Sequence, residues 1–231
     1  SIAPSAAQTE LARSLADLRA SLELPDGFAP PVEEEARRAA AAQVLPDADL
    51  TGIPFLTIDP PGSTDLDQAL HIERSGVGYR VRYAIADVPA LVRPSGAVDD
   101  EARRRGQTLY ARDGRVPLHP ASIGEEAGSL LPDALRSAYV WEIVLDGDGL
   151  EVSTSVARAR IRSRRQWSYA EAQEALDDGS APEPLALLAE VGPARIAQER
   201  ARGGASLNRP DEEIVFRDGA YAIERRATLP V

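Results

Sequence analysis

Three aspartates lie close together in a short loop between two apolar runs of this chain. They are Asp59, Asp65 and Asp67, and proline, glycine, serine and threonine fill most of the positions between them. Carboxylates at this spacing repel one another unless a cation compensates their charge. Mg²⁺ suits that role, because proteins hold it with one or two carboxylates while substrate phosphates supply further ligands. The alternative is a solvated turn whose acids cap local backbone groups, and spacing alone favours that simpler structure.

The composition narrows the choice of metal and excludes several classes of protein. The chain has no cysteine and two histidines, His71 and His119, so disulfide frameworks and thiolate metal sites are excluded and a histidine-rich zinc site is disfavoured. A metal would therefore be bound mainly through oxygen, which indicates Mg²⁺, Mn²⁺ or Ca²⁺. No apolar run has the length of a membrane span and no signal-peptide pattern opens the chain. We therefore expect a cytoplasmic protein with no membrane partner.

The charge argues against general coating of nucleic acids but permits a narrow basic groove. The formal net charge is −11 at pH 7, and all 26 basic residues are arginines. Non-specific binding to a phosphate backbone usually needs a net basic surface, whereas single arginine forks can bind single phosphates. The chain begins at Ser1 and contains no methionine, so we expect a fragment or a processed product of a longer polypeptide.

The elements around the aspartates predict where the site lies. Residues 53–58 have the length and β-branched content of a strand, and residues 69–73 resume a short apolar strand after the acids. A turn at 75–78 leads into 79–88, which alternates and then becomes continuously apolar, as a strand entering a core does. The strands at 69–73 and 79–88 therefore form a hairpin. The acids are expected at the mouth of a sheet.

The remaining pattern predicts an α+β fold with a mixed, largely antiparallel sheet and flanking helices. Helices are expected over residues 5–24, 32–45, 98–105, 169–179 and 184–202, and further strands or hairpins over 138–145, 150–161 and 214–226. Ser168 and Glu171 have the spacing of a capping box at the start of the fourth helix. The first 48 residues form an N-terminal helical segment in which no chemistry is visible.

Two further features have both a functional and a structural interpretation. Tyr110 stands among polar and basic neighbours, which suits stacking on a nucleotide base, although a half-buried strand tyrosine is the commoner case. Arginines recur at every second position from 158 to 164, with Arg165 beside them. On an extended strand they share one face, either as a phosphate-binding stripe or as a solvated edge. Because Val152 and Val156 have the same parity, we expect a bulge or a strand end before the arginines.

Five blocks of sequence, in this order, resemble the ribonuclease II/ribonuclease R (RNB) family of exoribonucleases. They read TIDPPGSTDLDQAL, YAIADVPALV, RRGQTLY, VPLHP and GSLLP. The resemblance covers residues 49–231, and it is strong over the first hundred of these and weak after position 179. It implies an RNB catalytic domain that is cut off near its middle. The remainder of that domain and an RNA-binding S1 domain would then follow downstream, and we expect a monomer.

The resemblance also implies an activity and a role for individual residues. Members of the family hydrolyse single-stranded RNA from its 3′ end with Mg²⁺ and release nucleoside 5′-monophosphates. Asp59, Asp65 and Asp67 match the first three of the family's four acids, while Gln68 stands where the family usually has the fourth. Two metals held by such acids can activate water and stabilise the leaving oxyanion. Tyr110 matches the family's tyrosine that packs against the 3′-terminal nucleotides, and Arg105 in the same block is a further candidate RNA contact.

The departure at Gln68 leaves alternatives to the enzyme open. A neutral amide cannot supply the fourth negative charge, so the chain could be a catalytically impaired RNA-binding protein of the same fold. A structural Ca²⁺-binding protein that uses the same acids is a third possibility. Asp87 could substitute for the missing carboxylate, although a structural role is the first interpretation of that residue.

Overall fold

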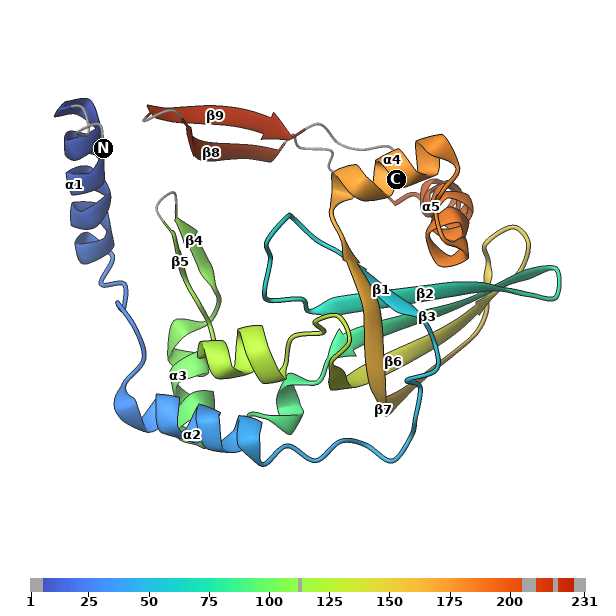
Figure 1. Cartoon of the computed structure of the whole chain (residues 1–231), viewed down its shortest axis with the longest axis horizontal. Coiled ribbons are helices and arrows are strands. Elements are labelled where there is room, and N and C mark those ends of the chain that lie inside the picture. Colours follow the sequence, from blue (N-terminus) through green and yellow to red (C-terminus); the bar gives the residue numbers. More distant parts are fainter. Residues whose placement is uncertain (1–5, 112–113, 205–210, 218–219, 227–231) are drawn as a thin grey trace.

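The computed structural model describes residues 6–111, 114–204, 211–217 and 220–226, and it has the expected α+β architecture (Figure 1). The helices are α1 (Ala6–Ser21), α2 (Pro30–Ala41), the 3₁₀ turn η1 (Val88–Ala90), α3 (Ala97–Arg105), the π-helical turn η2 (Ser122–Ala127), α4 (Tyr169–Asp178) and α5 (Glu183–Ala201). The strands are β1 (Phe55–Ile58), β2 (Gln68–Ser75), β3 (Gly78–Ala86), β4 (Leu109–Ala111), β5 (Gly114–Val116), β6 (Leu135–Leu145), β7 (Glu151–Trp167), β8 (Asp211–Arg217) and β9 (Ala220–Arg226).

Five strands close into a barrel in the order β1-β2-β3-β6-β7. Every pairing is antiparallel except the one that closes the barrel, in which β1 runs parallel to the end of β7. The sequence predicts the antiparallel hairpins, whose partners are neighbours along the chain. Closure joins Phe55 with Ser163, and no local pattern specifies a contact between residues so far apart.

Small side chains fill the barrel, because five strands enclose little volume. Its interior combines Phe55, Leu66 and Ile161 with a set of alanines from four strands. Those alanines are Ala69, Ala84, Ala86, Ala138 and Ala159. One tight approach requires glycine: a Cβ on Gly78 would lie 2.0 Å from the carbonyl oxygen of Leu145, at the start of β3.

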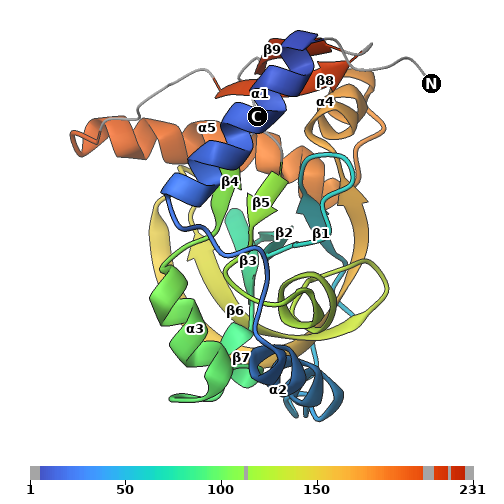
Figure 2. The ribbon, with the colours of Figure 1, turned by 90° about the vertical axis from the view of Figure 1, so that its left-hand side faces the viewer.

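Helix α5 packs against the outside of the barrel, and α4 lies next to it. Leu187 and Val191 of α5 pack on the outer face of β2 and β3 through Ile72 and Tyr79, and α4 lies beside α5 (Figures 1 and 2). The capping box predicted for α4 is present. The Glu171 N–H donates to the Ser168 hydroxyl at 3.2 Å, and the Ser168 N–H donates to the Glu171 carboxylate at 2.8 Å.

The second N-terminal helix is part of this fold. Val32 and Ala36 of α2 are buried against Val98 of α3 and Ile123 of η2. By contrast, α1 stands apart from the barrel in Figure 1. The predicted C-terminal hairpin is present as β8 paired with β9, and its turn at 218–219 falls outside the described residues. None of the helices in the described ranges is long and apolar enough to cross a membrane.

The β6–β7 pairing has an irregularity ahead of the arginines, at Val152 next to the turn, but none between Val156 and Arg158. The β6–β7 register is regular from Leu135–Arg162 to Val144–Ser153, and it shifts only beyond Val144, next to the turn. The valines do share the outer face with the arginines, but they are largely exposed: Val152 is 66% and Val156 48% accessible. The strand therefore needs no change of parity, because its outer face is open to solvent here.

Candidate active site

The acidic loop leaves the barrel at the end of β1 and is fixed at both edges by β7. The Asp59 N–H donates to the Trp167 carbonyl at 2.9 Å, and the Gln166 side-chain amide donates to the Ser63 carbonyl at 3.1 Å. Gly62 turns the loop with a φ of 82°, a left-handed conformation that favours glycine. Asp59 is thereby held at the mouth of the barrel, as the sequence predicts.

Leu66 anchors the other side of the loop and orients its two neighbours. Its side chain is fully buried in the barrel core. Its N–H donates to the Ser129 hydroxyl oxygen at 2.9 Å, and its carbonyl accepts from the Leu130 N–H at 2.9 Å. Since side chains alternate along an extended segment, a buried Leu66 places Asp65 and Asp67 on the opposite, open side. The Asp67 carbonyl is fixed in turn by the Ala86 N–H, at 2.9 Å.

The three aspartates line a common pocket. A cavity of about 200 Å³ is bounded by Asp59, Asp65 and Asp67 together with Tyr83 and Tyr169. The fold therefore brings the three predicted acids together around one cavity. A solvated turn whose acids only cap backbone groups would not require this convergence. Gln68 also lines this cavity, at the first residue of β2.

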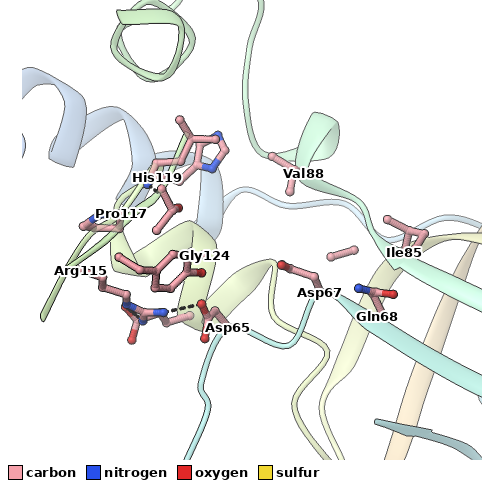
Figure 3. A pocket seen from close by; sticks show the side chains of 14 residues that line it. Asp65, Asp67, Gln68, Ile85, Val88, Arg115, Pro117, His119 and Gly124 are labelled. Atoms are coloured by element: carbon pink, nitrogen blue, oxygen red, sulfur yellow. Dashed lines mark hydrogen bonds and ion pairs between the residues drawn. The ribbon is translucent and has the colours of Figure 1, made fainter. Parts of the chain in front are cut away.

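A larger cavity of about 530 Å³ adjoins the acids on the side of β4, β5 and η2 (Figure 3). Asp65, Asp67 and Gln68 form one wall, and Tyr110 and His119 belong to the wall supplied by the segment after α3. The remaining lining is largely apolar, from Ile85, Val88, Pro117 and Leu118 among others. An elongated ligand with charged and flat apolar parts would suit this combination.

Burial and mutual repulsion raise the pKa of two of the aspartates. For Asp59 the main cause is burial, followed by the charges of Asp67 and Asp65. For Asp67 the main cause is again burial, followed by the charge of Asp65, while Arg115 opposes the shift. Burial and the charge of Asp59 also raise the pKa of Tyr83. The site thus holds negative charge that the protein itself compensates incompletely.

Asp65 differs from the other two because it has a cationic partner. The Arg115 guanidinium of β5 donates to the Asp65 carboxylate and also forms an ion pair with Glu125 at 2.7 Å. Glu125 accepts a hydrogen bond from the Thr64 hydroxyl at 2.8 Å. This network joins the acidic loop to β5 and η2, whose contacting residues lie 50 and 61 positions further along the chain.

The donor set fits a hard divalent ion that is held partly by other ligands. Asp59 and Asp67 offer carboxylate oxygens without a basic partner in the residues described, and Mg²⁺ needs only one or two such ligands when phosphates and waters complete its shell. Nowhere in the described ranges are three or more acidic or histidine side chains arranged to hold a metal ion by themselves. The ligand assignment for all three aspartates therefore stays a prediction.

Tyr110 is exposed rather than half-buried. Its side chain is 77% accessible and lines the large cavity and the groove beside Pro60 and Pro61. A ring so open contributes little to a core, so the structure favours a contact with a ligand over the packing role.

The structure does not support an RNA contact for Arg105. Its side chain is 2% accessible and forms an ion pair with Glu101 at 2.7 Å. The guanidinium also donates to the carbonyls of Pro117 and Gly27 and stacks on Phe28 at 3.7 Å. It therefore ties α3 to the segment before α2. The motif match gave no sign of this, because Phe28 and Gly27 lie far upstream.

The arginines of β7 mostly make structural contacts. Arg158 pairs with the buried Asp87 at 2.7 Å, and Arg160 pairs with Asp49 at 2.9 Å. Arg164 donates to the Thr51 carbonyl at 2.6 Å, and Arg165 stacks on the Trp167 ring. The first three side chains hold the segment before β1 and the end of β3 against the barrel, whereas Arg165 contacts a ring of its own strand. A free phosphate-binding stripe is not formed by them.

Asp87 has the structural role that was its first interpretation. It is 1% accessible, and its second oxygen accepts from the Ser137 hydroxyl at 2.5 Å. Both oxygens are therefore engaged at the end of β3, and Asp87 lines none of the three cavities that contain Asp65 and Asp67. It does not replace the carboxylate missing at Gln68.

The chain belongs to the RNB domain family, whose model matches residues 47–228. It is 32% identical over 187 residues to "Ribonuclease R" of Mycoplasma pneumoniae, covering 77% of this chain and 26% of that protein. It is also 32% identical over 179 residues to "Probable exosome complex exonuclease RRP44" of Caenorhabditis elegans, covering 74% of this chain and 18% of that one. The chain thus spans about a quarter or less of the length of these relatives.

The fold agrees with this membership. The structure of Mycoplasma genitalium RNase R in complex with ribose methylated single-stranded RNA superposes with a TM-score of 0.84 at 24% identity, over 93% of this chain and 36% of that one. Some relatives are named as inactive. "Inactive exonuclease DIS3L2" of Arabidopsis thaliana is 38% identical over 135 residues, covering 57% of this chain and 13% of that protein. The family alone therefore does not decide whether a member cleaves RNA.

Proposed function

We propose that this chain carries the acidic half of an active site that hydrolyses single-stranded RNA from its 3′ end with Mg²⁺. The observation that carries the proposal is the convergence of Asp59, Asp65 and Asp67 on one pocket, with two pKa values raised by burial and repulsion. Membership of a family that includes proteins named exonucleases supports the same activity.

The side chains have distinct parts in this proposal. Asp59 and Asp67 would hold a divalent ion together with the scissile phosphate. Asp65 would become a further ligand when the Arg115 guanidinium moves away from its carboxylate. A bound divalent ion lowers the pKa of a water ligand and neutralises charge on the leaving oxygen. No side chain of the pocket acts as nucleophile. Tyr110 supports the terminal bases from the far wall of the larger cavity, since base–aromatic stacking tolerates any sequence.

A catalytically impaired RNA-binding protein is the second candidate. Two observations favour it: Gln68 is neutral where the family usually has an acid, and Arg115 already occupies one side of Asp65. Both reduce the charge available to a metal. The relatives named as inactive show that the family includes proteins of this kind.

An end-labelled RNA separates the two candidates. We expect a 5′-labelled single-stranded RNA to shorten progressively from its 3′ end with Mg²⁺, and to remain intact when EDTA replaces the metal. Release of nucleoside 5′-monophosphates would confirm that the bond from phosphorus to the 3′ oxygen is the one hydrolysed, while the shortening of the 5′-labelled strand gives the direction. Binding of the same RNA by the full-length protein, measured by fluorescence anisotropy, without any shortening would reject the enzyme and support the second candidate.

A further inference from the structure

Arg115 bridges two carboxylates that face the larger cavity. It donates to Asp65, as the dashed line in Figure 3 shows, and it pairs with Glu125 at 2.7 Å. The three side chains are comparably accessible, at 29% for Arg115, 32% for Asp65 and 32% for Glu125. Glu125 is itself fixed by the Thr64 hydroxyl. The guanidinium is therefore shared between an acid of the loop and an acid of η2.

The charge of Arg115 is placed where a metal would act. It lines two of the three cavities that contain Asp65 and Asp67, and among the residues that the structure describes no other arginine lines any of the three. Its field also reaches Asp67, whose pKa is raised by burial and by the charge of Asp65 and is held back by Arg115. One arginine thus acts on two of the three aspartates.

We propose that Arg115, oriented by Glu125, is a positioning residue that fixes the Asp65 carboxylate and competes with the divalent ion for it. The inference rests on the proposed function, because it takes Asp65 as part of the metal-binding group. A fixed cation beside a carboxylate weakens the binding of a second cation there by Coulomb repulsion. Glu125 moderates that competition, since it draws part of the guanidinium away from Asp65.

The test is a Mg²⁺ titration of the full chain at constant ionic strength. The melting temperature Tm is measured at each Mg²⁺ concentration, and its rise gives the half-saturating concentration. For Arg115→Gln we expect the half-saturating Mg²⁺ concentration to fall about fivefold, the size typical of one partly exposed ion pair. Glu125→Gln should raise it by a similar factor, because Arg115 then pairs with Asp65 alone. In the Arg115→Gln background, Glu125→Gln should change it little, and this coupling is the signature of a shared guanidinium.

Two variants separate charge from structure. Arg160→Gln removes an arginine of similar exposure that pairs with Asp49 outside the cavities, so Tm should fall while the half-saturating Mg²⁺ concentration stays unchanged. Arg115→Lys keeps the charge and should stay within about twofold of the parent chain. It also keeps the test open if Arg115→Gln fails to fold, which circular dichroism would show.

Several outcomes overturn the inference. An unchanged or higher half-saturating Mg²⁺ concentration in folded Arg115→Gln would do so, and so would an equal effect of Glu125→Gln in both backgrounds. A parent chain that shows no Mg²⁺-dependent stabilisation would overturn it together with the metal assignment. RNA shortening is scored in parallel, so a chain that binds Mg²⁺ with the expected coupling but leaves RNA intact would reject the proposed activity alone.

Discussion

The backbone N–H of Leu66 donates to the hydroxyl oxygen of Ser129 at 2.9 Å, inside the barrel core. Both residues are essentially inaccessible to solvent, at 0% for Leu66 and 1% for Ser129. The bond joins the acidic loop to the segment before β6, 63 positions away. Because Leu66 lies between Asp65 and Asp67, this buried contact determines which way the two carboxylates face.

Ser129→Ala should therefore loosen the loop as well as destabilise the fold. The Leu66 N–H would be buried without a partner, which costs about 1 to 3 kcal/mol. Urea unfolding measures that loss, and a Mg²⁺ titration should show weaker binding. Ser153→Ala, on the exposed face of β7, is the matched control and should change neither quantity. A loss of stability with unchanged Mg²⁺ affinity would mean that Ser129 does not orient the acids.

Asp67→Asn should abolish cleavage and leave RNA binding almost unchanged. The carboxylate repels phosphates, so its loss removes no attraction to RNA, whereas loss of a metal ligand should slow hydrolysis by at least ~100-fold. Anisotropy and the end-labelled assay measure the two effects separately. Asp47→Asn removes an exposed acid outside the cavities and serves as control. Near-normal turnover in Asp67→Asn would refute the assignment of the acids.

Tyr110→Ala should change the length of the final product more than the rate on long RNA. The ring is exposed, so its removal should leave the fold intact. Stacking contributes about 1 to 3 kcal/mol per base, which matters most when few nucleotides remain bound. Denaturing gels should show digestion stopping at longer products, and Tyr110→Phe should restore the original ladder. An unchanged ladder in Tyr110→Ala would count against a stacking role.

Gln68→Asp tests whether the missing fourth acid limits metal binding. Gln68 lines two of the three cavities that contain Asp65 and Asp67, so a carboxylate there would add charge to the same site. We expect the half-saturating Mg²⁺ concentration to fall about fivefold, and the metal-free Tm at neutral pH to fall as repulsion increases. Gln68→Asn is the neutral control. If Gln68→Asp behaves like that control, the side chain at position 68 does not face the metal.

The local part of this architecture could be predicted from the sequence. The strands on either side of the acids follow from apolar periodicity, and the Ser168–Glu171 capping box follows from a spacing of three residues. The sequence also predicts that the acidic loop lies at the mouth of a sheet, because its flanking strands and its turn residues lie within the same short stretch.

The non-local part could not be predicted. The parallel pairing of β1 with β7 and the Arg115–Asp65 contact join residues that are far apart, and no pattern within either segment specifies its partner. In the sequence, Arg115 stands out only as a basic residue near Tyr110, and no pattern indicates that Glu125 belongs to the site. Arg105 shows the converse case: its motif position suggests an RNA contact, while Phe28 and Glu101 engage its side chain within the fold.

Repulsion among the acids also predicts how stability depends on pH. The folded-state pKa of Asp59 lies above its ordinary value, mainly because of burial and then because of Asp67 and Asp65. Its protonated form therefore favours the fold at pH below the ordinary carboxyl pKa of about 3.9, and that contribution is lost as the pH rises through the folded-state pKa. At neutral pH and without metal, the charged Asp59 destabilises the folded chain.

Asp59→Asn should accordingly raise the metal-free Tm at pH 7 by about 2 °C, and this gain should vanish as the pH approaches 3. Added Mg²⁺ should reverse the order, because the parent chain gains more from binding the ion. Asp49→Asn is the control of opposite sign: hydrogen bonds from Thr51 and the Arg160 charge hold the pKa of Asp49 well below its usual range, so its loss should lower Tm at pH 7. If Asp59→Asn lowers the metal-free Tm instead, the site is not a cluster of under-compensated carboxylates, and the case for a divalent ion at this position loses its physical basis.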